Sequence, residues 1–124
     1  MMLASLLVSM SFMAQPIVIE ESGKALYSAH CAVCHQASGG GVPMMQPPLK
    51  GSSKVLGSSD TLIYMVLKGS KAVPPGESDW DNEMPDFGFL SDAEIAKILT
   101  YVRSDFGNSE NGITKTDVAD RRAH

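Results

Sequence analysis

The chain has 124 residues, enough for one small domain with a modest core. Its 44% hydrophobic and 19% charged residues exclude a disordered chain, which would be less apolar and more charged. The 14 acidic and 10 basic residues give a net charge of −4, and no long run of Lys and Arg occurs, so a general nucleic-acid-binding protein is also excluded.

The first 19 residues contain no charged side chain. Within them, LASLLVSMSFMA is typical of the apolar region of a secretory signal, with cleavage after Ala14. We therefore expect a signal peptide over residues 1–14 and a periplasmic or otherwise exported protein. Two other interpretations stay open. One is that the stretch forms a buried strand or the end of a helix. The other is an uncleaved membrane anchor that extends to about residue 19, although a spanning helix needs roughly 20 residues and Pro16 interrupts this stretch.

A first short helix is predicted in EESGKALYSAHC, residues 20–31. Ser22 is suited to cap its N-terminus, and Leu26 and Tyr27 give it one apolar side. The next segment, residues 36–59, is rich in glycine, proline and serine, and it contains three successive glycines and a Pro-Pro pair. Because no helix sustains such a sequence, we predict a long loop there.

A second helix is predicted in TLIYMVLKG, residues 61–69, with Asp60 as its cap and Gly69 at its end. This helix is apolar nearly all round, which indicates that other elements cover it. Residues 70–89 follow as a second loop, because glycines and prolines are again frequent there.

The last main helix has the clearest signals. Ser91 and Glu94 have the spacing of a capping box, and Leu90 is placed to pack on Ile95 as a hydrophobic staple. Arg103 lies near the negative end of the helix dipole. The apolar side chains share one helical face: Ile95, Ile98, Leu99 and Val102.

Gly107 is suited to end this helix, and residues 108–124 form a polar C-terminal extension. Thr116 is a candidate cap for a short helix there, in which Asp117 and Arg121 pair four residues apart. The sequence shows no repeat, no alternating strand pattern and no hairpin signal. The chain is therefore predicted to be all-α, with three main helices and long loops.

Both cysteines lie in CAVCH, as Cys31 and Cys34, followed directly by His35. A zinc site usually has four ligands, and the only other histidines are His30 and His124. A thioredoxin-like dithiol usually follows a strand, and none is predicted here. A structural disulfide suits an exported chain but leaves His35 without a role.

Covalent haem attachment explains all three residues. The thiols of Cys31 and Cys34 match the two vinyl groups of one haem, and the adjacent His35 can bind its iron. We therefore predict one haem c, held covalently through the two cysteines.

Methionine is one option for the second axial ligand, and it favours the reduced iron. Four of the eight methionines lie in the leader, which leaves Met44, Met45, Met65 and Met84. Met65 falls within an apolar helix, where core packing is the usual role of methionine. Met84 lies in a loop stiffened by Pro85, and a loop can bring a sulfur atom to the iron. We therefore predict His35 and Met84 as the metal ligands.

These motifs resemble the class I monohaem cytochromes c of bacteria over residues 20–107, which form the predicted domain. Gly23 and Tyr27 lie where the family has a glycine and an aromatic residue on its first helix. Ile98 and Tyr101 match apolar and aromatic positions on the last helix. In the family, these four residues pack where the two terminal helices cross.

The resemblance also implies roles around the haem. PPLKG is similar to a family segment whose proline carbonyl, here that of Pro47, accepts the Nδ1–H of His35, while Leu49 packs on the ring. MPDFGFLSDAEIAKILTYVRSDFGN is similar to the bacterial methionine loop and last helix. The resemblance suggests that the indole of Trp80 reaches a haem propionate, and core packing is the alternative.

Two features depart from the family. The mitochondrial members carry a ring of lysines around the haem edge, whereas this chain has acidic residues around Met84. These acidic residues indicate either a partner with a basic surface or a loop that is kept polar by its contact with solvent. They are Glu77, Asp79, Asp81, Glu83 and Asp86. The segment after residue 107 resembles an extension of some bacterial members.

A haem with both axial positions filled by protein has no place for a substrate, so one-electron transfer is its remaining chemistry. We therefore expect an electron carrier rather than an enzyme, with transient redox partners of the dehydrogenase or terminal oxidase type. Two alternatives stay open: an open or labile sixth position, as in a gas sensor or peroxidase-like enzyme, and a subunit docked permanently on a dehydrogenase or oxidase. No nucleic acid is expected, and a membrane contact only through an uncleaved leader.

Overall fold

The computed structural model describes residues 14–15, 18–72, 80 and 82–124. Within these residues the chain forms helices and no β-strand, apart from one isolated bridge between Val42 and Gln46. The all-α prediction is confirmed. The elements are α1 (Gly23–His30), α2 (Ala32–His35), α3 (Ser53–Leu56), α4 (Ser59–Lys68), the 3-10 helix η1 (Ser70–Ala72), α5 (Asp92–Ser104) and α6 (Lys115–Ala123).

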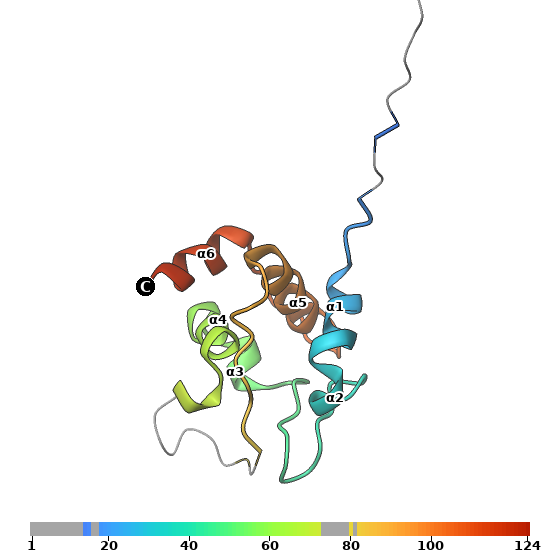
Figure 1. Cartoon of the computed structure of the whole chain (residues 1–124). Helices are drawn as coiled ribbons and strands as arrows, with labels where there is room; N and C mark the ends of the chain where they lie inside the picture. The colour runs from blue at the N-terminus through green and yellow to red at the C-terminus, as the bar shows by residue number, and fades with distance from the viewer. Residues whose placement is uncertain (1–13, 16–17, 73–79, 81) are drawn as a thin grey trace, which may run out of the picture.

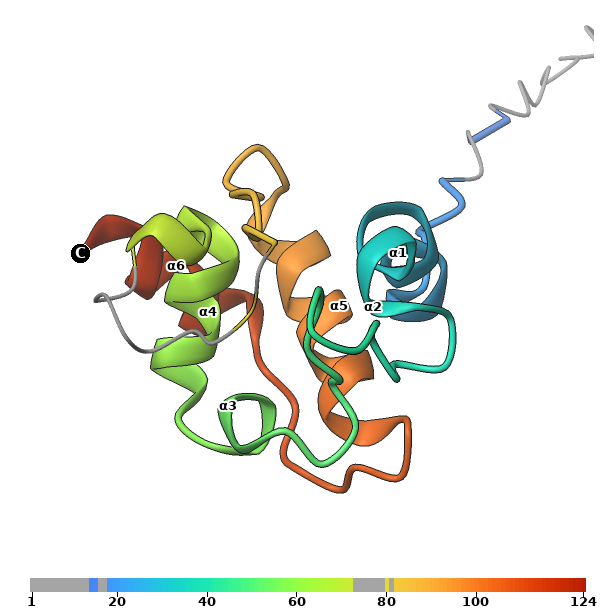
Figure 2. The same cartoon turned by 90° about the horizontal axis from the view of Figure 1, so that it is seen from below.

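Helix α5 runs through the middle of the molecule, with α1 and α2 on one side and α4 and α6 on the other (Figure 2). Gly23 lets α1 approach α5 closely, because a Cβ atom there would collide with the backbone carbonyl of Lys97. Beside it, the rings of Tyr27 and Tyr101 lie 5.4 Å apart, and Ile98 is buried. The helix crossing therefore uses the four residues that the resemblance implied.

Helix α6 lies across α4 and α5 at the end of the molecule opposite the long loops (Figure 1). Ile113 and Val118, both from residues 108–124, belong to the buried core, and Val118 is 0% exposed. The guanidinium group of Arg121 lies 4.5 Å from the centre of the Tyr64 ring on α4. This segment is therefore packed into the fold through apolar side chains, although most of its residues are polar.

Several predicted helix ends are confirmed. Ser22 caps α1 by accepting from the backbone N–H of Ala25. Gly69, with a φ angle of +79°, follows the last residue of α4. Ser91 and Glu94 form the predicted capping box at the start of α5.

Other boundaries were wrong. Ser58, rather than Asp60, caps α4, because the Ser58 hydroxyl reaches the N–H of Thr61 while Asp60 lies in the first turn. Helix α5 ends at Ser104, with Asp105 rather than Gly107 as its C-cap. The one-turn helix α3 lies inside the predicted loop, since a single turn has too few residues to show a periodic pattern.

The start of α6 was also predicted wrongly. Thr114, rather than Thr116, is the cap, and Asp117 completes a capping box with it. The carboxylate of Asp117 is therefore bound to Thr114, and Arg121 lies against Tyr64 instead of pairing with Asp117.

The predicted leader lies outside the described residues except for its last residue, Ala14, which is exposed. No helix in the described part of the chain has the length and apolar character needed to cross a membrane.

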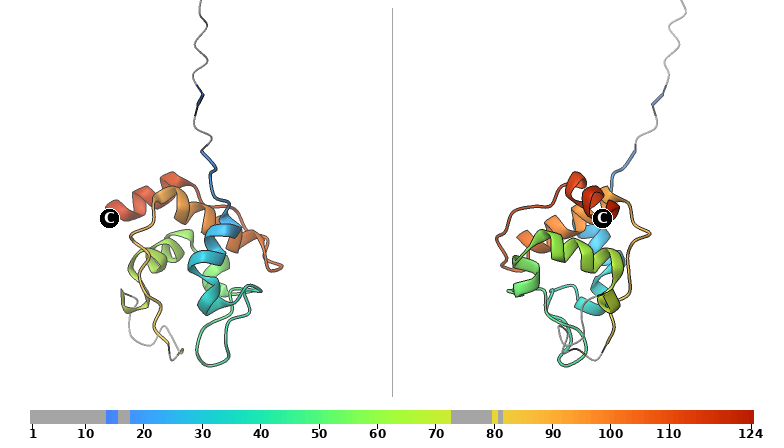
Figure 3. Two further views of the ribbon diagram at one scale, coloured as in Figure 1. Left: turned by 45° about the vertical axis from the view of Figure 1, so that its right-hand side comes forward. Right: turned by 90° about the vertical axis from the view of Figure 1, so that its left-hand side faces the viewer.

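Two long connections extend from the same end of the helical body (Figure 1; Figure 3). We call residues 36–52, which follow α2, the histidine loop, and residues 82–90, which precede α5, the methionine segment. One backbone hydrogen bond of 3.3 Å joins them, from the N–H of Asn82 to the carbonyl of Met45.

Candidate haem site

Both thiols and the imidazole of CAVCH lie on a single helical turn. Cys31 is the N-cap of α2, and the N–H of His35 donates to its carbonyl at 2.9 Å. Cys31 and Cys34 are free, half-buried thiols. Burial raises the pKa of Cys31 to about 11, and the neighbouring Cys34 thiol acts in the same direction.

The imidazole of His35 is buried and has a defined orientation. The residue is 8% exposed, and Nδ1 lies 2.9 Å from the carbonyl oxygen of Pro47. Burial lowers the pKa of His35, although the bond to Pro47 acts in the opposite direction. Because a carbonyl only accepts, Nδ1 carries the proton of the neutral ring and donates it, which leaves the lone pair of Nε2 free for a metal.

Two glycines bring the histidine loop back to His35. Gly41 has a φ angle of +65°, and a Cβ atom there would meet the backbone of Gln46 and Pro47. Gly39, with a φ angle of +68°, lies against the ring of Phe106 and accepts from the N–H of Leu49 at 2.8 Å. Only glycine combines a positive φ angle with such close approach to neighbouring atoms. Gly39 and Gly41 therefore let the loop turn so that the carbonyl of Pro47 reaches His35.

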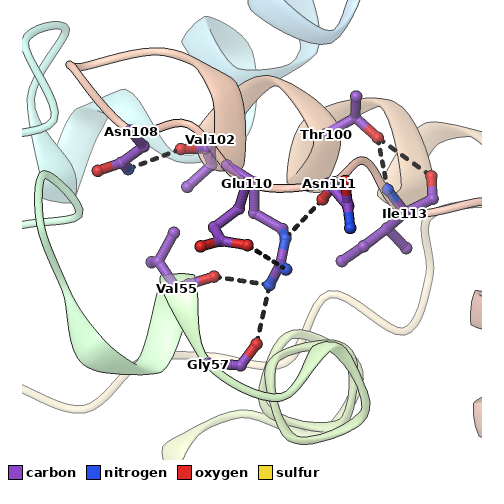
Figure 4. A network of polar contacts seen from close by, with 9 residues as sticks. Val55, Gly57, Thr100, Val102, Asn108, Glu110, Asn111 and Ile113 are labelled. Carbon is purple, nitrogen blue, oxygen red and sulfur yellow. Dashed lines mark hydrogen bonds and ion pairs between the residues drawn. The ribbon is translucent and has the colours of Figure 1, made fainter.

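Leu49 is half-buried against the core, and its backbone is held from the segment that follows α5. The buried side chain of Asn108 accepts from Gly51 at 2.8 Å and donates to the carbonyls of Leu49 and Val102 at 3.1 and 2.9 Å. Figure 4 shows the bond to Val102. Asn108 thus connects the histidine loop to the end of α5.

Arg103 makes a second buried network (Figure 4). Its guanidinium group donates to the carbonyls of Val55 and Gly57 at 2.8 and 3.1 Å, and Nε donates to the carbonyl of Asn111 at 2.8 Å. The prediction for Arg103 was only a favourable position near the helix dipole. The fold uses it to hold the turn of α3 beside the histidine loop.

On the methionine segment, Met84 is half-buried and packs against the core. Its N–H donates to the hydroxyl of Ser70 at 2.9 Å, and its carbonyl accepts from the N–H of Ser70 at 3.0 Å. Gly69 allows this pairing, because a Cβ atom there would meet the carbonyl of Met84 at 2.8 Å. The backbone of Met84 is therefore fastened to the first residue of η1, directly after α4.

The other candidate residues have different surroundings. Met44 and Met45 are 70% and 45% exposed, and Met65 is half-buried on α4. Trp80 is half-buried. Among the acidic residues, Glu83 pairs with Lys71 at 3.2 Å and Asp86 is exposed, whereas three others lie outside the described residues: Glu77, Asp79 and Asp81.

Comparison with known proteins agrees with this arrangement. The family model for cytochrome c matches residues 20–105. The chain belongs to the cytochrome c family. The cytochrome c subunit of a quinone alcohol dehydrogenase from Gluconacetobacter polyoxogenes is 34% identical, over 81% of this chain and 22% of the subunit. Cytochrome c-552 of Thermus thermophilus is 31% identical, over 73% of this chain and 72% of that protein.

Cytochrome c6 of Cyanidium caldarium is 33% identical, over 68% of this chain and 69% of that protein. The chain therefore matches most of these two small cytochromes, but it spans only about a fifth of the length of the dehydrogenase subunits.

As a member of the cytochrome c family, the chain carries covalent haem c. Its donor set fits this group, since α2 presents two free thiols and an imidazole whose Nδ1 is already bound to the protein. When bound, haem supplies a reversible one-electron change at its iron.

Proposed function

We propose that His35 and Met84 are the two axial ligands of the haem, and that the protein is a closed-site electron carrier rather than an enzyme. The observation that carries this proposal is the 2.9 Å contact between His35 Nδ1 and the Pro47 carbonyl. It presents Nε2 as the available nitrogen of a buried, neutral ring. Cys31 and Cys34 hold the haem covalently, with Leu49 against its ring and Trp80 toward a propionate.

Met84 is supported as the second ligand by its surroundings. It is half-buried against the core, and its backbone is fixed by Ser70 on both its N–H and its carbonyl. Met44 and Met45 are 70% and 45% exposed, and Met65 belongs to a regular helix. A thioether ligand favours the reduced iron, as a carrier that accepts electrons readily requires.

The partners of the carrier are redox proteins outside the cytoplasm, of the dehydrogenase or terminal oxidase type. The apolar start of the sequence supports export, and the quinone alcohol dehydrogenase and fructose dehydrogenase subunits among the relatives support a dehydrogenase. Encounters between redox proteins are usually small and transient, and charge steers them, so electron transfer should slow with rising salt.

A permanent place in a dehydrogenase complex is the second candidate, favoured by the match of 81% of this chain to the Gluconacetobacter subunit. Size-exclusion chromatography of the native extract separates the two. Elution at the mass of a small single chain supports the transient carrier, and co-elution with a dehydrogenase supports the subunit.

The axial ligands are tested by absorption spectra of the holo-protein, taken oxidised, reduced and with carbon monoxide. We expect a weak far-red sulfur-to-iron band in the oxidised wild type and no carbon monoxide binding. Met84→Ala should lose the band and bind carbon monoxide, because the sixth position then opens. Met45→Ala and Met65→Leu are the matched controls and should keep the band. Ready carbon monoxide binding by the wild type without the band would contradict the closed site and favour a gas sensor or peroxidase-like enzyme.

A further inference from the structure

One side chain of α6 is bound to the segment that carries Met84. The guanidinium group of Arg122 donates through Nη1 to the carbonyl of Gly88 and through Nη2 to the carbonyl of Leu90, both at 2.7 Å. Its Nε donates to the Asp92 carboxylate, also at 2.7 Å. Arg122 therefore holds the last part of the methionine segment and the first residue of α5 together.

The first part of the methionine segment is held from the other direction. Met84 pairs with Ser70, and the N–H of Phe87 donates to the carbonyl of Val66 at 2.9 Å. Both of these partners belong to α4 or to η1 directly after it. Arg122 binds the second half, so the segment is held to α4 and η1 at Met84 and Phe87 and to α6 at Gly88 and Leu90.

Helix α6 is a firm support for this contact. Val118 is completely buried, Arg121 lies on the Tyr64 ring, and Thr114 with Asp117 caps the helix. A planar guanidinium group that binds two backbone carbonyls and a carboxylate also has little freedom to move. Motion of the methionine segment away from α4 must therefore break charge-assisted hydrogen bonds.

We propose that Arg122 is a positioning residue for the sixth haem ligand, and that α6 acts as a brace which keeps Met84 at the iron and external ligands out. This inference rests on the proposed ligation by Met84. Release of the thioether requires the methionine segment to move, and each hydrogen bond that this movement breaks makes the open form rarer. The family match ends at residue 105, so the brace comes from outside the matched domain.

The experiment is an imidazole titration of the oxidised holo-protein, followed through the far-red band. In Arg122→Ala the apparent affinity for imidazole should rise roughly tenfold, the size expected when one or two charge-assisted hydrogen bonds are removed. The imidazole affinity of Arg122→Lys should lie between those of Arg122→Ala and the wild type. Lysine keeps the positive charge but lacks the planar guanidinium group that binds several acceptors at once. Asp92→Asn should have a smaller effect, because the two carbonyl contacts of Arg122 remain.

Two controls separate positioning from a general loss of stability. Lys115→Ala truncates an exposed side chain at the start of the same helix, and it should leave imidazole affinity near the wild-type value. Val55→Ala truncates a buried side chain on α3 and lowers global stability without touching the methionine segment. Equal imidazole affinity in Arg122→Ala and Val55→Ala, with the wild-type band intact, would overturn the brace alone. A wild type that lacks the band and binds carbon monoxide would overturn ligation by Met84 as well.

Discussion

The histidine loop and the methionine segment meet at one hydrogen bond between Asn82 and Met45, yet they are fastened in different ways. Buried groups hold the histidine loop: Asn108 is 7% exposed and makes three hydrogen bonds, two of them to that loop. The methionine segment is held nearer the surface, where the side chains of Arg122 and Asp92 are 35% and 25% exposed. Buried hydrogen bonds cost more to break than exposed ones, because water does not replace them.

This difference has a functional consequence. A rigid attachment of His35 keeps one axial ligand constant, and a softer attachment of Met84 makes the sixth position the one that opens first. Exchange of external ligands should therefore report on the methionine segment, and global unfolding on the histidine loop.

The largest effect is expected from Asn108→Ala. Truncation leaves the Gly51 N–H and the Leu49 and Val102 carbonyls without their partner, and it should lower the free energy of unfolding by about 2–3 kcal/mol. Denaturant unfolding of the holo-protein measures this decrease. Asn108→Asp is the matched control, because it keeps an acceptor for the Gly51 N–H but removes the donor to the two carbonyls. Its free energy of unfolding should lie between those of Asn108→Ala and the wild type. If Asn108→Ala lowered the free energy of unfolding by less than Ser70→Ala does, the histidine loop would not be the more firmly attached of the two segments.

Tyr27→Phe should have the next largest effect, and its size should depend on pH. The hydroxyl of Tyr27 donates to the carbonyl of Gln36, next to His35, at 2.6 Å, and its removal should cost about 1.5 kcal/mol at neutral pH. Burial raises the pKa of Tyr27 to about 12. The folded pKa lies above the unfolded value near 10, so the neutral phenol stabilises the fold fully below pH 10.

As the pH rises from about 10 through about 12, the wild type should lose this contribution while the phenylalanine variant has none to lose. The difference in unfolding free energy between the two proteins should therefore shrink over that interval. Parallel stability curves up to pH 12 would show that the Tyr27 hydroxyl does not hold the histidine loop.

The smallest global effect is expected from Ser70→Ala. It removes the acceptor for the Met84 N–H but leaves the backbone bond from Ser70 to the Met84 carbonyl, so the unfolding free energy should fall by only about 1 kcal/mol. The far-red band should nevertheless weaken more than in Asn108→Ala, since the hydrogen bond removed belongs to Met84 itself. Ser53→Ala is the control, because Ser53 is exposed and its loss should leave the band unchanged. A weaker far-red band in Asn108→Ala than in Ser70→Ala would contradict this comparison of the two segments.

Some features of this protein are encoded in residues close together in the chain. CAVCH contains both thiols and the imidazole within five residues, and Ser91 with Glu94 marks the start of α5 from three residues apart. The capping box is a local hydrogen-bond pattern and is independent of the rest of the fold. Single-turn elements such as α3, and the choice of Ser58 over Asp60 as a cap, are less predictable because several neighbouring residues satisfy the same local rule.

The haem-attachment motif, the all-α class and the main helices thus follow from the amino-acid sequence, because spacing of side chains along a helix specifies them directly. The supports of the two loops depend on the folded chain. Asn108 binds the backbone at Gly51 and Leu49, 57 and 59 residues away, and Arg122 binds the carbonyls of Gly88 and Leu90, 34 and 32 residues away. Every residue has a backbone carbonyl, and every residue except proline has an N–H, so no side-chain pattern marks these partners. Only the packing of α5 and α6 decides which backbone groups Asn108 and Arg122 meet.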